Sequence, residues 1–62
     1  MNGAEKLVLW LHRNRVRRHQ LAEQLKVSRP MVTQWCSGDR RPNLAHAVGI
    51  HRITNIPVEA WI

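Results

Sequence analysis

The sequence has little of what an enzyme, a secreted domain or a membrane protein usually requires. It contains no phenylalanine or tyrosine and a single cysteine, Cys36. An internal disulfide is therefore excluded, and a reducing compartment is favoured. No apolar run approaches the roughly 20 residues that cross a bilayer, and the N-terminus shows no secretory signal pattern. We therefore expect a cytoplasmic protein with no segment that spans a membrane.

Groups that commonly perform catalysis or bind metal are also scarce. The sequence has only four acidic residues, which are Glu5, Glu23, Asp39 and Glu59. No two of them are spaced for general acid–base chemistry, and no glycine-rich phosphate loop is present. Of the four histidines, His46 and His51 are five residues apart, which turns them to different faces of a helix rather than toward one zinc ion. We predict no enzymatic activity, no metal site, no cofactor and no small-molecule ligand.

Positive charge is abundant. Ten Lys and Arg residues against four acids give a net charge of +6 in 62 residues, which favours nucleic acid or an anionic membrane surface as partner. The densest basic run spans residues 13–19 and lies at the start of a helix predicted to begin near Arg17. Arginines oppose the dipole at a helix N-terminus, whereas a phosphate suits that position. The run therefore points to a phosphate partner. Because the folded pattern continues through Trp61, we expect that partner to be nucleic acid and expect no membrane partner.

The chain is short enough that only one domain, residues 1–62, is expected. Capping residues and apolar spacing predict helices over 3–14, 18–25, 29–36 and 44–54, and a last helical turn over 57–61. In the fourth helix, Leu44, Ala47 and Ile50 are expected to face inward, together with Ile53 or Val48. A small hairpin in the C-terminal third is the alternative to helix there.

Residues 20–35 carry the main signal. Leu21 and Leu25 mark the buried face of one short helix, and Val32 and Trp35 mark that of the next. The tight turn between them falls at Lys26, where a left-handed backbone is expected at a cost of about 1 kcal/mol. Two helices joined in this way present the second one outward.

The outward face of the second helix suits the reading of DNA bases. An α-helix in the major groove contacts base edges from its N-terminal residues. Arg29 suits a guanine edge and Gln34 an adenine edge, while Thr33 can contact thymine. Four arginines flank this helix in sequence and are expected to contact phosphates without reading sequence. They are Arg17, Arg18, Arg40 and Arg41.

The pattern LAEQLxVSRxxVxQWxxG at residues 21–38, with Arg41-Pro42 and Asn55-Ile56-Pro57 after it, resembles the Cro/repressor-type, lambda-repressor-like helix-turn-helix family. The resemblance implies an all-α, compact bundle of about five short helices that binds double-stranded operator DNA. The implied base contacts are Arg29, Pro30, Thr33 and Gln34. The expected phosphate contacts are Arg17, Arg18, His19, Ser28, Ser37, Arg40 and Arg41. Two departures from the family pattern are Lys26 in place of the usual turn glycine, and Cys36-Ser37 in place of acidic or amide residues.

A chain that holds this domain alone resembles the phage Cro proteins, which implies a phage or prophage repressor acting on a palindromic operator. It would act as a homodimer, formed in solution or only on DNA. The candidate dimer surface is Ile56, Val58, Trp61 and Ile62, although Trp61 could equally cap the core of the monomer. The alternative function is a protein-interaction module of the same fold, such as an antitoxin or adaptor.

Overall fold

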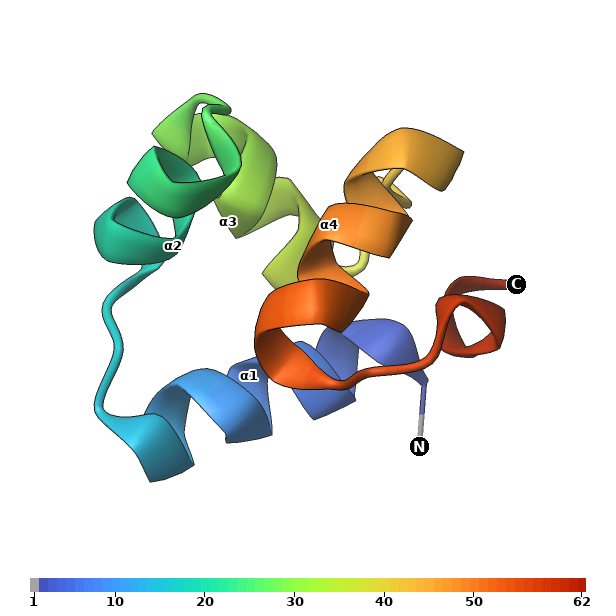
Figure 1. The fold of residues 1–62 in the computed structure, drawn as a ribbon, viewed down its shortest axis with the longest axis horizontal. Coiled ribbons are helices and arrows are strands. Elements are labelled where there is room, and N and C mark those ends of the chain that lie inside the picture. The colour runs from blue at the N-terminus through green and yellow to red at the C-terminus, as the bar shows by residue number, and fades with distance from the viewer. Residues whose placement is uncertain (1) are drawn as a thin grey trace.

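The computed structural model describes residues 2–62, which fold into four α-helices and one short 3-10 helix (Figure 1). The predicted helices are confirmed, with the third extending one residue further. The last turn differs: it is 3-10 rather than α-helical, and Pro57 is its N-cap rather than its first residue. No strand forms within residues 2–62, so the hairpin alternative is wrong. The elements are α1 Gly3–Asn14, α2 Arg18–Leu25, α3 Arg29–Ser37, α4 Leu44–Thr54 and η1 Val58–Trp61.

Three side chains fix where the longer helices begin. The backbone N–H of Glu5 donates to Asn2 Oδ1 at 2.9 Å, and that of His46 donates to Asn43 Oδ1 at 2.8 Å. Ser28 Oγ accepts from the N–H of Met31 at 3.3 Å. Each of these N–H groups would otherwise lack a partner at the helix end, and such a cap contributes about 1 kcal/mol. Local sequence therefore sets the starts of α1, α3 and α4.

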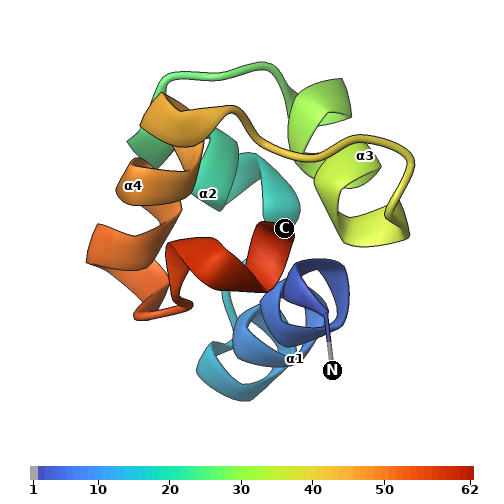
Figure 2. The ribbon, with the colours of Figure 1, turned by 90° about the vertical axis from the view of Figure 1, so that its right-hand side faces the viewer.

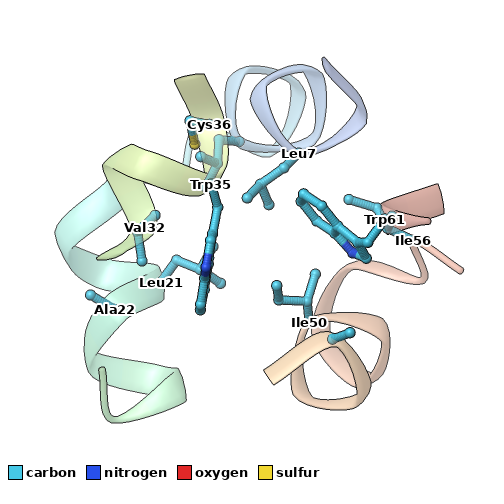
Figure 3. Close-up of a cluster of buried hydrophobic side chains, with 11 residues drawn as sticks. Leu7, Leu21, Ala22, Val32, Trp35, Cys36, Ile50, Ile56 and Trp61 are labelled. Atoms are coloured by element: carbon cyan, nitrogen blue, oxygen red, sulfur yellow. The ribbon is translucent and has the colours of Figure 1, made fainter. Parts of the chain in front are cut away.

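The core lies where the helices converge, around Trp35 (Figure 3). Leu7 from α1, Leu21 from α2 and Ile50 from α4 are fully buried, and Trp35 is 1% exposed. Burial of each aliphatic side chain contributes roughly 1.5–3 kcal/mol. Because Trp35 belongs to α3, the same side chain that completes the core also fixes the rotation of α3 about its axis.

The C-terminal 3-10 helix crosses between α4 and α1 (Figure 2). It inserts Trp61, which is 8% exposed and packs over Gly3. A Cβ at residue 3 would lie 2.5 Å from the Trp61 ring, so only glycine permits this approach. Of the two roles open to Trp61, it takes the core role in the monomer.

Leu44 does not pack inward as predicted. Its side chain is 73% exposed, whereas Ala47 and Ile50 of the same helix are buried. Leu44 is the first residue of α4, and the helical period alone does not show whether another helix covers that end. The beginning of α4 and the C-terminal end of the chain both lie on the right-hand side of Figure 1. Ile62 at that end is 90% exposed.

None of the helices within residues 2–62 has both the length and the apolar character to cross a membrane.

Candidate functional site

The buried face of α3 packs in the core and so fixes the orientation of its exposed face. Val32 and Trp35 anchor the helix in the core. At about 100° per residue, positions 29, 30, 33 and 34 fall within an arc of about 140° that excludes both anchors. Arg29, Pro30 and Thr33 are exposed and Gln34 is half-buried. The four predicted base-contact residues therefore share one face of α3.

An open groove of about 610 Å³ runs along one side of this face. Arg29 and Thr33 of α3 line it, and so do Arg17 and Arg18 at the start of α2. The backbone N–H of Arg17 donates to Gln20 Oε1 at 2.9 Å, which fixes this end of the helix without a capping acid. The fold thus brings three guanidinium groups to one groove beside a helix N-terminus, a setting that favours phosphate. The half-buried predicted phosphate residue His19 also lines it.

The groove also contains residues that the sequence analysis did not select. Its far wall is α1, which contributes Val8 and the exposed His12. The sequence alone does not single out His12, because nothing in it indicates that the end of α1 faces the start of α2. It adds an imidazole donor to the basic groove.

A smaller hollow of about 260 Å³ lies beside α3 and is lined by Arg40, Arg41 and Met31. The N–H of Arg40 donates to the carbonyl oxygen of Gln34 at 3.3 Å, so the loop after α3 is tied to the helix it follows. His46, a second residue that was not selected, also lines this hollow, and its ring lies 5.4 Å from that of Trp35. Basic side chains therefore lie on both flanks of α3.

Ser37 and Ser28 differ in what they can offer a phosphate. Ser37 Oγ lies 3.1 Å from the Gln34 carbonyl oxygen and 3.0 Å from Asp39 Oδ2, so its single proton is already engaged. The Asp39 carboxylate also adds negative charge there, which makes Ser37 the poorest phosphate ligand of the predicted set. Ser28 is exposed, and its oxygen caps α3 while its hydroxyl proton stays available.

The turn between α2 and α3 has the predicted left-handed residue. Lys26 has φ 57° and ψ 43°, and its N–H donates to the Glu23 carbonyl oxygen at 3.2 Å. Arg15, which ends α1, adopts the same region with φ 54°, and this was not predicted. Both are long basic residues in a conformation that costs about 1–2 kcal/mol. Two connections that position the groove therefore store backbone strain.

The four predicted dimer residues divide into two pairs. Ile56 and Trp61 are 5% and 8% exposed, so the core of the monomer already occupies them. Val58 is half-buried and Ile62 is exposed. Only Val58 and Ile62 retain appreciable surface for a second copy.

Cys36 does not line the basic groove of about 610 Å³. It is 8% exposed, and burial raises the pKa of its thiol above the ordinary value, while the nearby charge of Arg18 opposes that rise. A thiol that keeps its proton is a poor nucleophile. Within residues 2–62 no three His, Cys, Asp or Glu side chains gather closely enough to bind a metal ion.

A family model described as helix-turn-helix, of the Cro/C1 type, matches residues 13–61 of the chain. Searches of curated proteins and of solved structures found no match.

Proposed function

Because the chain belongs to the helix-turn-helix family of DNA-binding domains, we propose that it is a sequence-specific transcriptional repressor of the Cro-like kind. It binds a palindromic operator as a homodimer, with α3 in the major groove. The observation that carries this proposal is the basic groove beside the exposed face of α3. There Arg17 and Arg18 lie next to Arg29 and Thr33.

The proposed division of roles follows from this arrangement. Arg29 and Gln34 read base edges. A guanidinium can form two hydrogen bonds to the O6 and N7 atoms of guanine, and a side-chain amide can form two to the N6 and N7 atoms of adenine. Pro30 and Thr33 contribute contact with base methyl groups. The remaining basic residues hold the two phosphate backbones and set the register of α3. They are Arg17, Arg18 and His19 on one flank, and Arg40 and Arg41 on the other.

The size of the domain supports a dimer on DNA. Its Cα atoms span only 24 × 22 × 21 Å. Successive major grooves on one face of B-DNA are about 34 Å apart, so one copy cannot place helices in both. Val58 and Ile62 are proposed to contact the second copy. The exposed Leu44 joins them as an apolar side chain that its own monomer leaves uncovered.

The experiment is a selection of bound duplexes from a random DNA pool at near-physiological salt. We expect a palindromic consensus whose half-sites are centred about 10 base pairs, or one helical turn, apart. A consensus without symmetry would refute the dimer. Absence of any enrichment would refute sequence-specific binding and favour the interaction module.

A further inference from the structure

We propose that the α1 face turned away from the basic groove of Arg17, Arg18 and Arg29 (the DNA-side groove) binds an acidic, apolar helical segment of a partner protein. The face borders a groove of about 410 Å³ between α1 and the segment Asn55–Pro57. Its apolar floor is formed by Leu9, Trp10, Ile56 and Pro57. Leu9 is 37% exposed and Trp10 is half-buried, so apolar surface remains open to a partner there.

Charge identifies the occupant. Lys6 and Arg13 border the floor at its two ends, and none of the described residues that line the groove is acidic. The two basic residues are seven positions apart on α1, which places them about 10 Å apart along the helix axis. A partner helix with two carboxylates at i and i+7 and aliphatic side chains at i+3 and i+4 matches both the rim and the floor.

The groove and the DNA-side groove occupy different faces of α1. Positions 8, 11 and 12 line the DNA-side groove, whereas positions 6, 9, 10, 13 and 14 line this one. At about 100° per residue the centres of the two sets lie roughly 170° apart around the helix. One domain can therefore hold DNA and a partner helix together. This simultaneous occupancy rests on the proposed DNA-binding function, whereas binding of the partner by the free domain does not.

The test is a selection of random 16-residue displayed peptides, performed on the free domain and again on the operator-bound domain. We expect both selections to enrich peptides with paired acids around aliphatic residues. The variant Lys6→Glu/Arg13→Glu should lower the affinity of an enriched peptide at least 10-fold. The matched control Lys26→Glu/Arg52→Glu, which alters two exposed basic residues outside this groove, should change it less than 2-fold.

A second variant tests the floor without charge reversal. Leu9→Ser removes a partly exposed side chain that no core position depends on, so the domain should fold, as checked by circular dichroism, and lose peptide affinity several-fold. Enrichment of no peptide, or of peptides without acids, would overturn the proposal. So would an unchanged affinity of the Lys6→Glu/Arg13→Glu variant. If that variant altered only the oligomeric state of the domain, the occupant would be a second copy and the proposal would be wrong.

If the free domain binds these peptides and no DNA sequence is selected, the partner site stands and the proposed repressor function fails. If operator DNA is selected but the peptide dissociates from the complex, simultaneous occupancy fails alone.

Discussion

Replacing Lys26 by glycine should stabilise the domain. Lys26 has φ 57°, and a side chain in that left-handed region costs about 1–2 kcal/mol. Glycine removes this cost but gives the unfolded chain more freedom, which offsets roughly 0.4–1 kcal/mol. The net gain should be about 1 kcal/mol in the free energy of unfolding. For a domain of this size, that raises Tm by about 4–8 °C.

The assay is urea and thermal unfolding of the parent chain and of three variants. Lys26→Ala serves as control, because it removes the charge but keeps a Cβ in the same conformation, so it should gain little. The converse change is Gly38→Ala, at φ 83°, where an added Cβ would meet nothing within 4 Å. Its loss of about 1 kcal/mol would measure backbone strain without a clash. If Lys26→Gly gave no gain while Gly38→Ala showed its loss, the strain assigned to Lys26 would be refuted.

Three further predictions concern the core, the buried thiol and the far wall of the groove. Gly3→Ala should cost about 1–3 kcal/mol of stability by urea unfolding, because its Cβ meets the Trp61 ring; a neutral result would mean that Trp61 does not pack there. Burial raises the pKa of the Cys36 thiol, so above the ordinary thiol pKa the folded protein keeps a proton that the unfolded chain has lost. The contribution of this group to the free energy of unfolding is therefore fully present below the ordinary thiol pKa and is lost as the pH rises above it. Unfolding curves from pH 7 to 10 should decline more for the parent than for Cys36→Ala, and parallel curves would contradict this. His12→Arg should steepen the salt dependence of DNA binding by about one phosphate contact, whereas Asn14→Arg, which places the same charge outside the basic groove, should not. Equal salt slopes for the two variants would show that α1 does not contact DNA.

The helix boundaries could be predicted because they depend on local chemistry. Asn2, Ser28 and Asn43 each cap a helix whose start was predicted from the sequence. Gly38 and Asn55 end α3 and α4 in left-handed conformations. Each of these helix ends depends on residues only a few positions apart, so it can be predicted without knowledge of the tertiary fold.

The sequence could not show which apolar residues meet. A helical period gives the spacing of apolar rows but not whether another helix reaches the end of a row, which is why Leu44 was misplaced. Nothing in the sequence indicates a reason for glycine at position 3. Glycine is needed there because Trp61, 58 positions later, packs directly over its backbone. The same limit applies to His12, which joins the site only because α1 packs against α3 and lies across the groove from the start of α2.

The central claim is that the outer face of α3 reads sequence while the flanking arginines hold phosphates. It is tested most directly with the double variant Arg29→Ala/Gln34→Ala and the comparison variant Arg17→Ala/Arg18→Ala. For each, affinity is measured on the selected operator and on an unrelated duplex over a range of salt. Each lost base contact should cost about 1–3 kcal/mol of discrimination.

We predict that Arg29→Ala/Gln34→Ala binds both duplexes almost equally while retaining most of its salt dependence. Arg17→Ala/Arg18→Ala should weaken both equally and reduce the slope by about two contacts. Full operator preference in the Arg29→Ala/Gln34→Ala protein would contradict the assignment of α3 as the reading helix.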